Sequence, residues 1–187
     1  MSPRPIEVPL DGLSDGVVRL RLAADSDVER ITAIVHDREV IRWTTIPAGQ
    51  TQNGTREWMQ RGMAGLASGS DLALVIADAA SDEPIGTIGL HEIHRAAERA
   101  TAGYVLAREA RGRGLGRRAL RLLCAYAFDD LRLARVEVTI EAQNAASRAT
   151  AASVGFREEG VLRSYMPIAG ERRDMLMYGL LPDDLRP

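Results

Sequence analysis

Arginine and glycine alternate over the six residues Arg111-Gly112-Arg113-Gly114-Leu115-Gly116. A strand is expected before them, over residues 102–107, and an amphipathic helix after them, over residues 115–131. Glycine lets the backbone approach a ligand closely and adopt positive φ angles. The start of a helix offers unpaired N–H groups and a partial positive charge. The stretch therefore predicts a phosphate or pyrophosphate site, to which arginine side chains can add charge-assisted hydrogen bonds.

Two common phosphate-binding loops do not fit this stretch. The Walker pattern ends in Gly-Lys-Ser/Thr, and the chain contains no lysine. The dinucleotide fingerprint Gly-x-Gly-x-x-Gly begins well at Gly112 and Gly114, but its third glycine falls on Arg117. That glycine serves close packing of the helix on a strand, which an arginine would obstruct. Glu137 has the spacing of the fingerprint's acidic residue, which we interpret as a coincidence. A dinucleotide-dependent oxidoreductase is the third hypothesis, and it would bind NAD(H) and have little affinity for CoA.

A different motif, Arg/Gln-x-x-Gly-x-Gly/Ala, fits the same stretch at Arg111, Gly114 and Gly116. Further matches lie on either side of it: Gly103-Tyr104-Val105-Leu106, the pair Asn144 and Ser147, and Gly155-Phe156. By these motifs the chain resembles the GNAT acetyltransferase superfamily, and within it the RimJ/RimL-like branch. The resemblance extends over residues 16–181 and is densest over residues 104–156.

The resemblance implies an α/β (α+β) GNAT fold with a central, mixed, mostly antiparallel twisted sheet of about seven strands and about four helices. The sheet is expected to splay between its fourth and fifth strands, at residues 102–107 and 135–140, where acetyl-CoA would bind. Backbone groups of the fourth strand would bind pantetheine, and N–H groups of the loop would bind pyrophosphate. The residues implied to bind CoA are Val105, Leu106, Arg111, Gly112, Arg113, Gly114, Leu115, Gly116, Arg117, Asn144 and Ser147.

Acetyl transfer to an amine requires a group that protonates the departing thiolate. By analogy with the branch, Ser147 is the first candidate for this acid, and Tyr165 is the second. Each has a simpler interpretation: Ser147 as a polar residue in the first turn of a helix, and Tyr165 as a half-buried strand aromatic. Asn144 is in any case a favourable helix N-cap residue.

The general base is harder to assign. Relatives often carry a glutamate just before the Gly-Tyr of the fourth strand, and some carry one in the C-terminal strand pair. The matching positions here are Thr101 and Met166, and neither side chain can act as a base. The remaining candidates are His91, Glu92 and His94. Strand alternation places Glu92 opposite His91, and Glu92 is the preferred base, acting directly or through water.

These residues must be positioned by a fold that the remaining sequence constrains. The chain has 187 residues, 45% of them hydrophobic, which suffices for one well-formed core. A single domain over residues 1–187 is expected, with residues 1–14 as an irregular tail. The predicted order of elements is β-α-α-β-β-β-α-β-α-β-β. Ser26-x-x-Glu29 predicts a capping box at the first helix, and residues 44–54 are expected to form a loop.

Composition restricts the remaining possibilities. The formal net charge of -2 gives no global attraction to nucleic acid or to an anionic membrane. No segment approaches the roughly 18 apolar residues of a membrane helix, and a lone cysteine, Cys124, rules out an intrachain disulfide. The spacing of His36, His91 and His94 does not suggest a metal site. A cytoplasmic protein without bound metal is expected.

The leading hypothesis is an acyl-CoA-dependent N-acyltransferase that moves an acetyl group from acetyl-CoA to a primary amine by direct attack in a ternary complex. The branch points to the α-amine of a protein N-terminus. One alternative acceptor is a small molecule, such as an antibiotic or an amino acid derivative. Another possibility is a non-catalytic acyl-CoA-binding module, suggested by Thr101 and Met166. Residues 43–54, the second helix and residues 166–172 are expected to select the acceptor, and a homodimer is possible because the branch often forms one.

Overall fold

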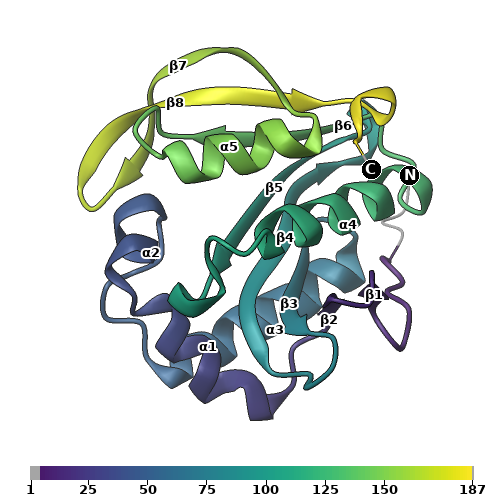
Figure 1. Ribbon diagram of the computed structural model, residues 1–187, viewed down its shortest axis with the longest axis vertical. Helices are drawn as coiled ribbons and strands as arrows, with labels where there is room; N and C mark the ends of the chain where they lie inside the picture. Colours follow the sequence, from purple (N-terminus) through teal and green to yellow (C-terminus); the bar gives the residue numbers. More distant parts are fainter. Residues whose placement is uncertain (1–4, 187) are drawn as a thin grey trace.

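The strands of the computed structural model, which describes residues 5–186, form one eight-stranded sheet in the order β1-β2-β3-β4-β5-β6-β8-β7 (Figure 1). Every neighbouring pair is antiparallel except β5 and β6, which are parallel. The strands are β1 Leu13–Ser14, β2 Val18–Arg21, β3 Leu72–Asp78, β4 Pro84–His94, β5 Arg99–Leu106, β6 Arg135–Ile140, β7 Arg157–Ile168 and β8 Glu171–Leu180.

Five α-helices connect and cover the strands: α1 Val28–Val35, α2 Arg38–Trp43, α3 Gln52–Ser68, α4 Leu115–Asp129 and α5 Ala145–Val154. The predicted order of elements is confirmed, but the counts of seven strands and four helices are each low by one. The additional helix is α2, whose six residues are too few to show a helical repeat. The additional strand is β1, whose two residues fall in the expected irregular tail.

The N-terminal segment is more ordered than the word tail suggests. Ile6 is buried, and its N–H donates a hydrogen bond to the carbonyl of Leu66 in α3. β1 pairs with β2 through Leu13 opposite Leu20. Residues 1–4 of the predicted tail lie outside the described residues. Among residues 5–186, no helix is both long enough and apolar enough to cross a membrane.

The two faces of β3 pack against different helices. Val75 and Ala77 cluster with Ile31 of α1 and with Trp58 of α3. The alternate residues Leu74 and Ile76 belong to the larger core that contains the apolar face of α4. The two faces of β3 therefore contact different sets of side chains, and Figure 1 shows α3 and α4 on opposite faces of the sheet.

The parallel strands β5 and β6 pair over only three residues of each strand. Arg99 to Thr101 of β5 lie opposite Arg135 to Glu137 of β6. Beyond this point β5 continues to pair with β4 as far as Leu106, and β6 continues with β8 as far as Ile140. The predicted splay between these two strands is confirmed, and it leaves one edge of each strand without a strand partner.

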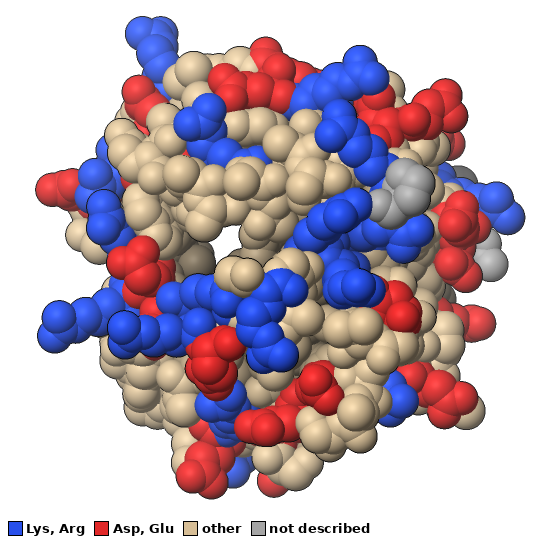
Figure 2. All heavy atoms as spheres, in the orientation of Figure 1, with Lys and Arg blue, Asp and Glu red and all other residues tan. Residues whose placement is uncertain are grey.

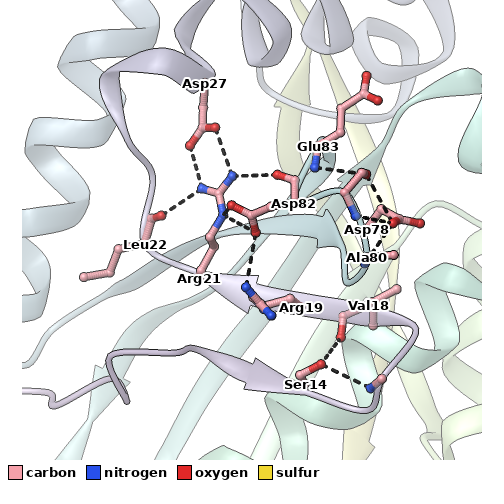
Figure 3. A network of polar contacts seen from close by, with 12 residues as sticks. Ser14, Val18, Arg19, Arg21, Leu22, Asp27, Asp78, Ala80, Asp82 and Glu83 are labelled. Atoms are coloured by element: carbon pink, nitrogen blue, oxygen red, sulfur yellow. Dashed lines mark hydrogen bonds and ion pairs between the residues drawn. The ribbon is translucent and has the colours of Figure 1, made fainter.

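A buried ion pair fixes the connection from β2 to α1 (Figure 3). Arg21 donates to both carboxylate oxygens of Asp27, at 2.7 and 3.0 Å, and also to Asp82 at 3.0 Å. Burial alone would raise the pKa of Asp27, but hydrogen bonds from Arg21 and from the Ala24 N–H outweigh burial and lower the pKa. The capping box predicted at Ser26 is therefore wrong, because Asp27 accepts the backbone hydrogen bond at this helix start.

Candidate functional site

The splay between β5 and β6 opens into a cavity of about 1230 Å³. Both strands line it, together with the start of α4, one face of α5, and residues from α1, α2 and α3. Single-ligand pockets commonly measure about 300–1,000 Å³, so the cavity can hold more than one molecule. Figure 2 shows the opening in the middle of the molecule, bordered on one side by a concentration of basic side chains. These side chains are arginines, since the chain contains no lysine.

The loop before α4 has the geometry of an anion site. Gly112 and Gly114 have φ angles of +71° and +74°, which favour glycine because side chains crowd the backbone there. A Cβ atom on either glycine would meet no described atom within 4 Å. α4 begins at Leu115 directly after Gly114, so the unpaired N–H groups of its first turn lie at the cavity lining. These features are those that the arginine-glycine stretch predicts.

Gly116 has a different structural role from the two glycines before it. A Cβ atom at this position would lie 3.2 Å from Leu106 Cδ1 and 3.3 Å from Tyr104 Cε2. The absence of a side chain therefore lets the first turn of α4 pack closely against β5. In the dinucleotide fingerprint, the third glycine allows this close packing of helix on strand. Here Gly116 has that role, one residue before the position of the third glycine in the fingerprint, which is Arg117.

Arg111 lines the cavity, but its guanidinium already has protein partners. It donates to the Leu106 carbonyl from Nε at 3.1 Å and from Nη2 at 2.9 Å, and Nη2 also lies 2.9 Å from Asp37 Oδ1. Asp37 also accepts from the Glu39 N–H at the start of α2. Burial would raise the pKa of Asp37, but the hydrogen bonds from Arg111 and Glu39 lower it overall. Arg111 thus ties the end of β5 to α2.

The start of α5 faces the cavity through Asn144 and Ser147. The Asn144 side chain accepts a hydrogen bond from the Ser147 N–H at 3.1 Å, which confirms the predicted N-cap. Gly155 ends the helix with a φ angle of +119°, which confirms the predicted C-terminal position. The Ser147 hydroxyl has no hydrogen-bond partner within residues 5–186. It is therefore available to a ligand.

A second polar contact holds α5 against the C-terminal hairpin. Arg148 Nε donates to the Tyr178 hydroxyl at 3.1 Å, and that hydroxyl donates to Glu158 Oε2 at 2.7 Å. Burial is the largest cause of the raised pKa of Tyr178. The contact fixes the residue next to Ser147 and so limits movement of the Ser147 side chain relative to the cavity.

Not every residue singled out in the sequence reaches the cavity. Glu92 is exposed outside the lining, with a φ angle of +51°, where the pairing of β4 with β5 is interrupted. Its neighbour His91 lines the cavity instead. Tyr165 is 45% exposed and also lies outside the lining, in an irregular part of β7. The Arg113 side chain is exposed and does not contribute to the lining either.

The opposite wall comes from the segments expected to select the acceptor. Residues 43–47 and five residues of α3 line the cavity, as does Met166, while residues 167–172 do not. α2 adds Glu39, which accepts a 2.9 Å hydrogen bond from Trp43 Nε1. This contribution was not predicted, because α2 is too short to show a helical repeat in the sequence. The signal that could have found it is Asp37 followed two residues later by Glu39, a pattern that favours a helix start.

Metal and thiol chemistry find no site in the described part of the chain. No group of three or more potential ligand side chains occurs within residues 5–186. Cys124 is fully buried in α4, and its burial raises the pKa of the thiol. The thiolate, which is the reactive form, is therefore disfavoured.

Comparison with known proteins agrees with this geometry. The family model described as "Acetyltransferase (GNAT) domain" matches residues 18–157. YdaF of Bacillus subtilis (strain 168), named as a candidate ribosomal N-acetyltransferase, is 38% identical over 96 residues, which are 51% of this chain and 52% of YdaF. The uncharacterized N-acetyltransferase p20 of Bacillus licheniformis is 38% identical over 101 residues, which are 54% of this chain and 57% of p20. The chain thus spans just over half the length of either relative.

A solved structure extends the likeness over most of the chain. Mycobacterium smegmatis RimJ in complex with CoA-disulfide superposes with a TM-score of 0.83 and 27% sequence identity. The match covers 94% of this chain and 87% of that one. It therefore includes the elements on both sides of the cavity.

Proposed function

Because the chain belongs to the GNAT acetyltransferase family, we propose that it is an acyl-CoA-dependent N-acetyltransferase that moves an acetyl group from acetyl-CoA to a primary amine. One observation carries the proposal: the cavity between β5 and β6, with the start of α4 in its lining and space for a second ligand. Transfer within a ternary complex requires donor and acceptor to lie side by side, and a single cavity lined by all these elements permits it.

The donor would bind along β5. The first N–H groups of α4, after Gly114, suit the pyrophosphate. Beyond Thr101, the edge of β5 toward β6 has no strand partner, so its backbone groups can bind the amides of pantetheine. The Leu106 carbonyl already accepts a hydrogen bond from Arg111. The backbone groups that bind the pantetheine amides are therefore expected nearer Val105. Asn144 and Ser147 would contact the donor from the opposite wall.

The chemistry is a nucleophilic acyl substitution. The acceptor ammonium first loses a proton to a base, and the free amine nitrogen then attacks the thioester carbonyl carbon. The tetrahedral intermediate collapses by breaking the carbon–sulfur bond, and the CoA thiolate leaves and takes up a proton. The attacking nitrogen gives up its second proton, which restores the group that protonated the thiolate, so that the products are the amide and the CoA thiol. We assign the proton that the thiolate takes up to the Ser147 hydroxyl, which lines the cavity and has no partner among the described residues.

The proposed acceptor is the α-amine of a protein N-terminus. This choice is consistent with the ribosomal N-acetyltransferase activity for which YdaF is named, although that name does not specify the amine. Three carboxylates line the cavity, those of Glu39, Glu57 and Glu141, and they would attract a cationic amine of any kind. A small-molecule amine is therefore the alternative acceptor. A cytoplasmic location and a homodimer remain predictions.

Release of free CoA thiol from acetyl-CoA tests the proposal. The acceptors are an alanine-terminated peptide, a serine-terminated peptide, free amino acids and spermidine, and the same peptides with blocked N-termini serve as controls. We expect turnover with free N-termini and none with blocked ones. Faster turnover of spermidine or of a free amino acid than of the peptides would show that the acceptor is a small-molecule amine and not a protein N-terminus. Tight binding of CoA without turnover of any amine would identify an acyl-CoA-binding module instead.

A further inference from the structure

His91 projects from β4 into the cavity at the point where β5 and β6 separate. It pairs with Thr101 of β5, and Thr101 is also the last β5 residue that pairs with β6. A Cβ atom on Gly103 would lie 3.9 Å from both Cδ2 and Nε2 of His91. The imidazole thus lies beside Gly103, with its Nε2 edge toward β5.

An aspartate lies on the other side of the same ring. Asp71 Oδ1 is 3.5 Å from His91 Nδ1, and Asp71 is not part of the cavity lining. The second carboxylate oxygen, Oδ2, accepts a hydrogen bond from Ser70 Oγ at 2.7 Å. The order across the ring is therefore Asp71 carboxylate, Nδ1 and Nε2, with Nε2 on the side of Gly103 and both side chains partly exposed, His91 by 52% and Asp71 by 40%.

The segment that carries Asp71 is held firmly. The Ile93 N–H donates to the Ser70 carbonyl at 2.9 Å, which ties this segment to β4 two residues beyond His91. α3 packs so closely against it that a Cβ atom on Gly65 would lie 2.6 Å from Asp71 Cβ. The backbone positions of the carboxylate and the imidazole are thus set by the same two elements, α3 and β4.

We propose that His91 is the general base of the acetyl transfer and that Asp71 is a positioning residue that orients its ring. This inference rests on the proposed acetyltransferase function. Neutral Nε2 takes the proton from the acceptor ammonium, and the amine then attacks the thioester. Asp71 Oδ1, 3.5 Å from Nδ1, favours the tautomer that carries its proton on Nδ1 and leaves Nε2 free.

The position of His91 along the cavity agrees with this role. The pyrophosphate site lies at the start of α4, just after the Leu106 end of β5, whereas His91 lies near Thr101 at the closed end. A donor anchored by its pyrophosphate and extended along β5 would bring its acyl end toward His91. The base is then beside the reacting carbonyl, where the acceptor nitrogen must lose its proton.

Other ionisable groups of the cavity are less suited to the role. Glu39 accepts a hydrogen bond from Trp43, and Glu57 accepts one from Asn53. Glu141 faces Arg173 at 4.0 Å. The remaining charged side chains in the lining, Arg61, Arg111 and Arg117, are cations. Histidine is also the side chain that most often acts as a general acid or base in enzymes.

The test compares variants by steady-state kinetics with acetyl-CoA and the alanine-terminated peptide, or whichever amine of the panel is turned over fastest. His91→Gln should lower kcat by about 100-fold or more and leave the Kd for CoA unchanged. Asp71→Asn should lower kcat by a smaller factor than His91→Gln does. In a protein that already carries His91→Gln, adding Asp71→Asn should not lower kcat further. The matched control, His94→Gln, changes an exposed histidine outside the lining and should retain activity.

Two readouts separate a base from a structural residue. Free imidazole added to His91→Ala should restore part of the lost turnover, and the acidic limb of the kcat/KM profile should change in His91→Gln. A folded His91→Gln with wild-type kcat would overturn the assignment, as would a loss explained wholly by weaker CoA binding or the absence of any imidazole rescue. Those results leave the acetyltransferase function standing, whereas wild-type protein that acetylates no amine overturns both proposals.

Discussion

At the scale of single residues, Ser147 has a free hydroxyl on a fixed helix start. Asn144 caps that start, and the Arg148–Tyr178 contact holds the helix against the C-terminal hairpin. If Ser147 protonates the thiolate, Ser147→Ala should lower kcat by about 100-fold and change the Kd for CoA by less than about twofold. Kinetics at saturating acetyl-CoA, together with calorimetric titration of CoA, measure the two effects separately. Weaker CoA binding with unchanged turnover at saturation would reduce Ser147 to a ligand contact.

The Arg21–Asp27 ion pair predicts a dependence of stability on pH. The pKa of Asp27 is lower in the folded protein than the ordinary value of about 3.9. Its ionised form therefore stabilises the fold above about pH 4, and that stabilisation is lost as the pH falls through the folded pKa. Asp27→Asn should lower the free energy of unfolding by about 3 kcal/mol at pH 7, and the difference from wild type should shrink below about pH 4.

Urea unfolding at a series of pH values measures this difference. The matched control is Asp25→Asn, since Asp25 forms an ion pair with Arg56 in which the aspartate side chain is 81% exposed. Exposed pairs contribute at most about 1 kcal/mol, so the control should change stability little at any pH. If the two substitutions lower the free energy of unfolding equally, the burial of Asp27 does not explain the stabilisation by its ion pair.

At the scale of elements, the turn before α4 should bind the donor through its open geometry. Gly114→Asp places a side chain and a negative charge at a position with φ +74° and no neighbouring atom, where the phosphates are expected. CoA binding should be lost. The backbone strain of a non-glycine residue at this φ angle should also lower the free energy of unfolding by about 1–2 kcal/mol. Gly16→Asp is the control, because Gly16 has φ +83° and an equally open position in the turn between β1 and β2, and it should bind CoA normally.

Gly116 should behave differently from Gly114 in the same turn. Gly116→Val would force branched atoms against Tyr104 and Leu106 of β5 and separate α4 from the sheet. We expect a loss of about 1–3 kcal/mol in the free energy of unfolding, measured by urea denaturation, with CoA affinity falling as a consequence. A fully stable Gly116→Val that fails to bind CoA would instead place this residue in the phosphate path.

The elements that the sequence predicted are those with long periodic patterns or clear end signals. α4 has an extended apolar stripe, and α5 is bounded by Asn144 and Gly155, so both were found. α2 was missed, and with it Asp37, the partner of Arg111. These residues are 74 positions apart, so only the tertiary structure reveals that the arginine side chain is engaged by the protein.

The preference for Glu92 as the base illustrates a second limit. Alternation correctly separated His91 from Glu92, but alternation alone does not tell which face of a strand borders a cavity. That depends on where β5 and β6 part and on how α3 packs against β3 and Asp71. The local irregularity, with Glu92 at φ +51°, also cannot be recognised from a pattern of residue types.

The expected single domain over residues 1–187 remains a prediction.

At the scale of the whole molecule, the two parts of the sheet meet over a short junction. Three residue pairs join β5 to β6, and the rest of the boundary is the cavity. A ligand that contacts β5 and α4 on one side and α5 on the other would add contacts across this boundary. Binding of CoA should therefore stabilise the entire fold and not the loop alone.

Thermal unfolding tests this expectation. Ligand at about 100 times its Kd stabilises the folded state by about 2.7 kcal/mol, and each kcal/mol raises the Tm of a chain of this length by roughly 2–4 °C. CoA should thus raise the Tm by about 5–10 °C, with the cooperativity of unfolding retained. Gly114→Asp should abolish the increase, and Gly16→Asp should preserve it. NAD should produce no comparable increase; if it does, and CoA does not, the cavity is a dinucleotide site and the oxidoreductase hypothesis replaces the acetyltransferase.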